Sequence, residues 1–519
     1  MSDLMSLIFL GSPARNSRMA STADPLRQSP CVAACLFCRF VFGGLVACGL
    51  FVGGLVFDGI AVTTGLASDW PQFRGTNGSA VDPSGDKLPT ELGPDRNQLW
   101  KTPLPAGHSS PAIVGNRIFI TAVRDKKLLT MGLDRPTGTV QWESEAPYER
   151  LETIHRIGSH AQSSPCADAE CVVSFFGSSG LYCRDHSGKL LWKRSMGPFV
   201  NDFGAASSPI LVGERLYLCQ DHDLDSFLVC LDKRTGNEIW KTDRSEFLRN
   251  SCTPIVWNND GHPQIVVAAT LRVVGYDLDT GKEAWTVRGI SRTVVSSPSV
   301  GQDGNLYLAG WAAGGDEAEG IRIEPFDDVA SSRDANKNGF LEEEELREGP
   351  VYQRFSQADR NKDGHLTRVE YELFRSLFDQ GKNLLLSIKP GAAGDSTETH
   401  VRWRHPKLVP FCASPVLVGG LLFTIKDGGI LQCLDAGTGK ASRPRRLEAS
   451  ASYYASPVAG DGKIYLIDEQ GRLTVIAAHQ DMEILHTADF KEDVFATPAV
   501  VDGKIYLRTA SALFCFGLK

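Results

Sequence analysis

The chain has 519 residues and a formal net charge of −8, from 54 Lys and Arg against 62 Asp and Glu. This balance provides no basic surface and argues against nucleic acid as a partner. The hydrophobic fraction of 42% is ordinary for a globular protein, and the 51 glycines indicate many tight turns.

The N-terminal segment, residues 1–67, is predicted to be a signal peptide or a membrane anchor. Arginines precede an apolar run, the stretch Phe40–Phe57 carries no charge, and small residues follow at Gly65–Ser68. This order is typical of a secretion signal. An uncleaved anchor is the alternative, because the uncharged stretch nearly spans a bilayer. Leu45–Cys48 also resembles a lipoprotein cleavage box, although the residues after it stay apolar. Export would place the protein in the periplasm or cell envelope.

A Ser/Thr-Pro pair recurs along the rest of the chain. The pairs are Ser110-Pro111, Ser164-Pro165, Ser208-Pro209, Thr253-Pro254, Ser297-Pro298, Ser414-Pro415, Ser456-Pro457 and Thr497-Pro498. They are separated by 54, 44, 45, 44, 117, 42 and 41 residues. All intervals but the fifth fit one four-stranded propeller blade, whose period is roughly 40–50 residues.

Each pair is followed by an apolar run, a glycine turn and an alternating strand, as in Gly115–Ile120 and Gly462–Ile467. Alternation at period two indicates a strand with one buried face. An Asp-x-x-Thr-Gly turn and a tryptophan then follow, with the tryptophans at Trp142, Trp240 and Trp285. The Asp and Thr side chains can bond their own turn, glycine allows positive φ, and the indole needs cover between neighbouring blades.

The two ends of the repeat region are expected to meet. Trp100 has the outer-strand signature without a blade before it, whereas the repeat that begins at Thr497 ends at Phe514–Phe516 without a tryptophan strand. A strand around Trp100 should therefore complete the last blade and hide the edges of the ring. The predicted fold is all-β, an eight-bladed β-propeller with a small α-helical insertion. Residues 68–317 and 386–519 are its two parts.

These motifs resemble the quinoprotein-like propeller superfamily. Its tryptophan-docking motif is Asp-x-x-Thr-Gly-x-x-x-Trp, and the likeness extends from Trp70 to the C-terminus, apart from the insertion. That family includes pyrroloquinoline quinone dehydrogenases and non-catalytic scaffolds such as the propeller lipoprotein of the outer-membrane β-barrel assembly machine. The Trp70–Gly75 opening looks like that of exported propellers from planctomycete-type bacteria.

The long fifth interval is explained by an insertion over residues 318–385, with two EF-hand-like loops. Each loop has oxygen side chains at positions one, three and five, glycine at six and Glu at twelve, which suits calcium, a hard cation with six to eight oxygen ligands. The predicted ligands are Asp334, Asn336, Asn338, Phe340, Glu342 and Glu345 in the first loop, and Asp359, Asn361, Asp363, His365, Thr367 and Glu370 in the second. Phe340 and His365 would act through their backbone carbonyls. The alternative is a pair of acidic turns without metal.

Leu341 and Leu366, at position eight of the loops, are expected to pair in a short two-stranded contact. We expect calcium to rigidify the insertion as a docking surface.

The resemblance raises a quinone-dependent dehydrogenase as the alternative function. Such enzymes commonly carry two adjacent cysteines, and no Cys-Cys pair occurs in the sequence, so pyrroloquinoline quinone is not the expected cofactor. Candidates for a channel-mouth site precede the Ser/Thr-Pro pairs or lie in nearby loops. They are His108, His160, Arg249, Asn250, Tyr453 and Tyr454, with His155, Asp221, His222, Asp223 and Asp225.

The sequence therefore predicts an exported calcium-binding β-propeller that acts as a protein-binding scaffold of the cell envelope. The expected partner is an envelope protein or a polysaccharide, the chain is expected to be a monomer, and no catalytic residue is assigned. The alternatives are a pyrroloquinoline quinone-type oxidoreductase and a small-molecule binder of the central channel.

Overall fold

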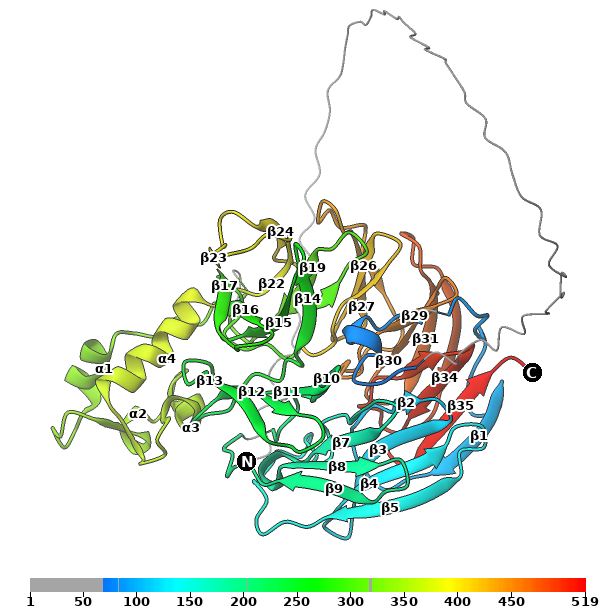
Figure 1. Ribbon diagram of the computed structural model, residues 1–519. Coiled ribbons are helices and arrows are strands. Elements are labelled where there is room, and N and C mark those ends of the chain that lie inside the picture. The colour runs from blue at the N-terminus through cyan, green and yellow to red at the C-terminus, as the bar shows by residue number, and fades with distance from the viewer. Residues whose placement is uncertain (1–68, 83, 202, 317–319) are drawn as a thin grey trace, which may run out of the picture. The chain divides into compact units, whose positions relative to one another are not determined.

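A computed structural model describes residues 69–82, 84–201, 203–316 and 320–519 (Figure 1). The chain divides into two units, Met1–Thr64 and Gly65–Lys519, and only the second contains described residues. The predicted signal or anchor segment lies outside them. No helix in the described part of the chain is long and apolar enough to cross a bilayer.

Eight sheets, the blades, follow one another along the second unit, which confirms the predicted eight-bladed propeller (Figure 1). Each blade is an antiparallel meander whose first strand is innermost, and these first strands contact one another among blades 1 to 3 and among blades 6 to 8. The strands of blades 1 to 4 are β2 (Ala112–Val114), β3 (Arg117–Arg124), β4 (Lys127–Asp134) and β5 (Val140–Ala146); β6 (Cys166–Ala167), β7 (Cys171–Phe175), β8 (Leu181–Asp185) and β9 (Leu190–Arg194); β10 (Ile210–Val212), β11 (Arg215–Gln220), β12 (Phe227–Asp232) and β13 (Glu238–Asp243); and β14 (Ile255–Asn259), β15 (His262–Ala269), β16 (Arg272–Asp277) and β17 (Glu283–Arg288).

Blades 5 to 8 follow the same plan, and a short strand, β23 (Gly394–Asp395), adds in parallel to the outer edge of blade 4. Their strands are β18 (Ser299–Val300), β19 (Leu306–Gly310), β22 (Leu384–Ile388) and β24 (Val401–His405); β25 (Val416–Val418), β26 (Leu421–Lys426), β27 (Ile430–Asp435) and β28 (Arg445–Arg446); β29 (Val458–Gly460), β30 (Lys463–Ile467), β31 (Arg472–Ala477) and β32 (Ile484–Asp489); and β33 (Ala499–Val501), β34 (Lys504–Arg508), β35 (Ala512–Gly517) and β1 (Gln98–Pro103).

The ring is closed as the sequence predicts. Strand β1 pairs antiparallel with β35, with Trp100 opposite Cys515 and Lys101 opposite Phe514. The first described strand of the chain is therefore the outer strand of the last blade. Both edges that an open stack of blades would expose are covered.

The docking tryptophans lie between blades, over the glycine of the next turn. Trp100 covers Gly138, where an added Cβ would come within 2.5 Å of the indole. The indole N–H of Trp100 donates to the Arg135 carbonyl at 3.2 Å. Trp285 is different, because it donates to Gln264 in its own sheet. The added strand β23 pairs with β17 beside Trp285, whose ring lies 5.4 Å from that of Trp257.

The insertion leaves blade 5 after Gly310 and returns at Leu384, so the predicted end at residue 385 falls just inside β22. Its elements are α1 (Phe326–Arg333), β20 (Leu341–Glu342), α2 (Glu343–Leu346), a 3-10 turn (Tyr352–Arg354), α3 (Phe355–Ala358), β21 (His365–Leu366) and α4 (Arg368–Gln380). Leu341 pairs with Leu366, as predicted. The insertion has its own apolar core, against which Leu248 and Leu271 of the propeller pack.

The nine cysteines in the described residues are free thiols. Cys166 and Cys171 are both buried as small apolar groups in blade 2.

Candidate functional site

The Ser and Thr residues of the repeated Ser/Thr-Pro pairs form a closed hydrogen-bonded ring around the propeller axis. Each backbone N–H donates to the hydroxyl of the corresponding residue in the next blade, over distances of 2.9–3.1 Å. Members of this hydroxyl ring, in order, are Ser110, Ser164, Ser208, Thr253, Ser297, Ser414, Ser456 and Thr497. Buried N–H groups need acceptors, and the ring supplies one for each blade. The repeat that the sequence displays is therefore the contact that holds neighbouring blades together at the axis.

One end of the channel is closed by the N-terminal segment 70–82. Trp70 exchanges backbone hydrogen bonds with Ile113 of blade 1 at 2.8 and 2.7 Å. Four residues later, Arg74 donates to the Ser299 hydroxyl of blade 5 at 3.2 Å and to the Pro415 carbonyl. Because blades 1 and 5 are opposite in an eight-membered ring, the segment crosses the axis. It then hydrogen bonds to Ala459 of blade 7.

Arg74 anchors this plug. Its side chain is fully buried, and its acceptors are a hydroxyl and carbonyls from blades 5 and 6. Burial lowers the pKa of the Arg74 guanidinium to about 9. A buried cation held by neutral oxygens is costly to strip of those partners, so the segment is firmly bound to the ring.

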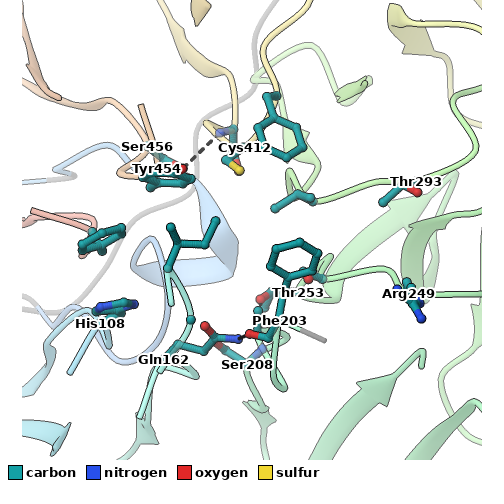
Figure 2. Close-up of a pocket in the computed structure, with 18 of the residues that line it drawn as sticks. His108, Gln162, Phe203, Ser208, Arg249, Thr253, Thr293, Cys412, Tyr454 and Ser456 are labelled. Carbon is teal, nitrogen blue, oxygen red and sulfur yellow. Dashed lines mark hydrogen bonds between the residues drawn. The ribbon is translucent and has the colours of Figure 1, made fainter. Parts of the chain in front are cut away.

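Above the plug lies a cavity of about 370 Å³ (Figure 2). Phe73 of the plug and seven of the eight ring residues, all except Ser297, line it. The residue two positions before each ring residue also lines it, in every blade. These eight residues are His108, Gln162, Ala206, Ser251, Val295, Cys412, Tyr454 and Phe495.

The walls of the cavity differ in chemistry. On blades 1, 8 and 7, His108, Phe495 and Tyr454 stack with ring centroids 4.1 and 5.2 Å apart. Figure 2 shows His108 and Tyr454 on one side of the cavity and Arg249 on the other. Trp311 and Phe411 add a second aromatic contact at 4.9 Å. The cavity can therefore cover an apolar group on one side and reach a polar group on the other.

Predicted mouth residues fall into two groups. His108, Arg249 and Tyr454 line the cavity, which confirms them. His160, Asn250 and Tyr453 are not among the residues that line the cavity, so for these three the prediction was wrong. His160 bonds the Glu152 carbonyl, Asn250 the Leu248 carbonyl and Tyr453 the Ala449 carbonyl.

The loop after β11 supplies structure rather than an open site. Asp221 accepts two hydrogen bonds from the buried Arg244. His222 is buried with its ring 4.5 Å from that of Phe199, and burial lowers its pKa to about 4. Asp223 accepts from Arg249. The remaining candidates, His155 and Asp225, lie outside the cavity lining: His155 packs 5.3 Å from Phe203, and Asp225 is exposed.

Sequence reasoning missed the cavity residues around the insertion. Arg292, Trp311 and Gln357 all line the cavity. Gln357 belongs to α3 of the insertion, so the insertion forms part of the wall. These residues do not occur at a fixed position relative to the repeated Ser/Thr-Pro pairs. The repeat could have predicted only the lining residues that lie two positions before each ring residue.

The two predicted calcium loops share one conformation. Asp334 and Asp359 each accept the N–H of the glycine at position six, Gly339 and Gly364, at 3.0 Å. In both loops, the side-chain oxygens at positions three and five each accept a hydrogen bond from the backbone N–H two residues later. The acceptors are Asn336 and Asn338 in the first loop and Asn361 and Asp363 in the second. Both glycines have positive φ, 83° and 85°. The predicted ligand atoms in both loops are oxygens, which suit calcium.

The glutamates at position twelve cap their own helices. Glu345 accepts the N–H groups of Ala335 and Glu342, and Glu370 accepts the N–H and hydroxyl of Thr367. Among the described residues, no three His, Cys, Asp or Glu side chains are gathered closely enough to hold a metal ion. The predicted shells depend equally on amide and backbone oxygens, and calcium binding stays a prediction.

Comparison with known proteins agrees with the fold. The family model described as outer membrane protein assembly factor BamB matches residues 92–220 and 179–315. The outer membrane protein assembly factor BamB of Burkholderia pseudomallei is 25% identical over 205 residues, which are 37% of this chain and 48% of that protein. The match therefore spans about half the length of that curated relative.

Two solved structures share the fold. BamB from Moraxella catarrhalis aligns with a TM-score of 0.52 and 13% identity, over 81% of this chain and 97% of that chain. The quinohemoprotein alcohol dehydrogenase from Comamonas testosteroni aligns with a TM-score of 0.51 and 12% identity, over 87% and 81%. Residues 92–315 are therefore similar to the BamB family model, and the two solved structures share the β-propeller fold of this chain.

Proposed function

We propose that the protein is an exported, calcium-binding propeller that acts as a protein-binding scaffold of the cell envelope. The observation that carries this proposal is the asymmetry of the ring. The segment 70–82 closes one end of the channel, and the aromatic cavity opens at the other end beside the insertion. A single open face with exposed aromatic side chains, such as Phe203 at 45% exposure, suits a protein partner.

The relatives support the envelope location. The family model and the curated relative are both named for outer membrane protein assembly. This name favours a scaffold that binds envelope proteins. Export rests on the basic, apolar and small order of residues 1–67.

The insertion is proposed to act through calcium. The second loop is tied to the propeller beside the cavity: Lys362 lies 3.4 Å from Asp223, and Arg360 donates to the Ser245 carbonyl at 2.8 Å. An ion bound by residues 359–370 would fix the loop from which these contacts extend. Calcium would thereby stiffen the docking face rather than act in chemistry.

The function is tested by affinity capture from an envelope extract, with the full chain as bait, in calcium and in chelator. We expect defined envelope proteins to be retained in calcium and largely released by the chelator. Retention of nothing above a bait-free control would contradict the scaffold role. A calorimetric titration without calcium uptake would refute the metal sites separately.

A further inference from the structure

Two guanidinium groups at the joint between propeller and insertion form no ion pair with any carboxylate in the described residues. Arg292, in the loop before blade 5, donates to the Ala313 carbonyl and lies 4.3 Å from the centroid of the Phe378 ring. Arg354 of the insertion lies 5.9 Å from the same ring and donates to Pro350 and Gln353 oxygens. Within the described parts of the chain, no carboxylate forms an ion pair with either group.

The surroundings make this unusual. The positive charge of Arg249 also acts on Arg292, and Arg249 is paired with Asp223, which in addition pairs with Lys362. Burial first, and then the positive charges of Arg354 and Arg249, lower the pKa of Arg292 to about 10. The Nε–H of Arg292 is buried and has no acceptor among the described residues. Like charges held together in a protein whose net charge is −8 indicate a place for an external anion.

The cavity beside this joint supplies the rest of a site. Arg292 lines the cavity together with Gln357 of the insertion. Seven of the eight hydroxyl-ring residues line it, and each ring hydroxyl accepts an N–H but donates its own hydrogen to no acceptor in the described residues. The opposite wall is the aromatic stack of His108, Phe495 and Tyr454.

We propose that this joint binds an acidic segment of a partner polypeptide, with its carboxylate between Arg292 and Arg354 and a neighbouring apolar side chain against the aromatic wall. Guanidinium groups bind carboxylates through paired, charge-assisted hydrogen bonds. The remaining donors of the hydroxyl ring suit backbone carbonyls of the same segment. The inference rests on the proposed scaffold function and names the chemistry of the partner.

The test uses an array of labelled pentapeptides, acetylated and amidated at their ends, in which Glu or Asp adjoins Phe, Trp or Leu. Each has a counterpart with Gln or Asn, and free phenylacetate is measured in parallel. Binding to the full chain is followed by fluorescence anisotropy and calorimetry. We expect one or more acidic peptides to bind and their amide counterparts to bind at least tenfold more weakly.

The variants Arg292→Gln and Arg354→Gln should each weaken the acidic peptides about tenfold or more. Arg375→Gln is the matched control, because Arg375 lies on helix α4 of the same insertion and is paired with Glu372 and Asp379. Circular dichroism checks that each variant folds, and Arg354→Gln remains informative if Arg292→Gln does not fold, since Arg354 is on the insertion.

Three results would each overturn the inference. They are equal binding of acidic and amide peptides, unchanged binding in both arginine variants, and tighter binding of phenylacetate than of every peptide. Capture of envelope proteins that is unchanged in the two arginine variants would also count against it, while leaving the scaffold function standing. Loss of capture in the wild-type protein would instead concern the scaffold function.

Discussion

The backbone N–H of Thr497 donates to the hydroxyl of Ser110 at 3.0 Å, across 387 residues of sequence. This bond is the eighth and last of the hydroxyl ring, and it joins the final repeat to the first. Strand β1 pairs with β35 as the outer strand of the last blade, and its Trp100 donates to the Arg135 carbonyl of blade 1. The ring is thus closed near the axis by the Ser110 hydroxyl and at the outer side by strand β1.

The first prediction concerns this inner seal. Ser110→Ala removes the acceptor of a buried N–H, and an unsatisfied buried donor costs about 1–3 kcal/mol. We expect the free energy of unfolding to fall by that amount in denaturant titrations. Ser331→Ala, on an exposed turn of α1, is the control, and Ser110→Thr should keep most of the stability. Equal stability of the Ser110→Ala and Ser331→Ala variants would show that the ring is dispensable.

The second prediction concerns the docking of Trp100 on the next turn. Gly138 and Gly115 both have positive φ, 74° and 51°, so alanine strains the backbone at either position. Only at Gly138 would the new Cβ also meet an indole, at 2.5 Å, whereas nothing lies within 4 Å of it at Gly115. Gly138→Ala should therefore destabilise the protein by about 1–3 kcal/mol more than Gly115→Ala. Thermal unfolding of both variants measures the difference, and similar losses would argue against a tight contact.

The third prediction concerns acid. Burial lowers the pKa of His222 to about 4 in the folded protein, although Asp221, Asp223 and Asp225 favour its protonation. The ordinary value is 6.5, so the unfolded chain takes up this proton first. Stability from His222 is complete above about pH 6.5 and is lost as the pH falls towards 4, by on the order of 2–3 kcal/mol.

The variant His222→Phe keeps the packing against Phe199 and removes the titrating group. The slope of unfolding free energy against pH should become shallower between pH 6.5 and 4. His479→Phe, at an exposed position, serves as the control and should leave the slope as in the wild type. An unchanged slope in His222→Phe would place the acid sensitivity elsewhere, with His108, whose pKa burial also lowers to about 4, as the next group to vary.

The fourth prediction separates the two proposed calcium loops. The second loop contacts the propeller through Lys362 and Arg360, and the described residues of the first loop form no such ion pair or hydrogen bond with it. Calcium should slow hydrogen exchange at Ser245–Ser251 in the wild type and in Glu345→Gln, but not in Glu370→Gln. The matched glutamates occupy position twelve of each loop, so the two variants lose the same ligand. Identical exchange in both variants would contradict a link between the second loop and the cavity wall.

The residues alone were sufficient for the architecture. Eight Ser/Thr-Pro pairs and the unpaired Trp100 strand predicted eight blades and their closure, because each blade must repeat the same contacts with its neighbours. The pairing of Leu341 with Leu366 was predicted in the same way, from equal positions in two similar loops. These features can be predicted from the sequence because the contacts that form them repeat at regular intervals along the chain.

The site was decided by contacts that have no period. Trp70 and Arg74 are neighbours in sequence yet reach opposite blades, so the plug becomes visible only when the ring is closed. Arg292 and Arg354 are 62 positions apart, yet both lie close to the ring of Phe378 because the insertion packs against the propeller. Sequence spacing determines which residues repeat. Tertiary packing alone determines which single residues share a cavity, because the distance between them depends on every blade that separates them.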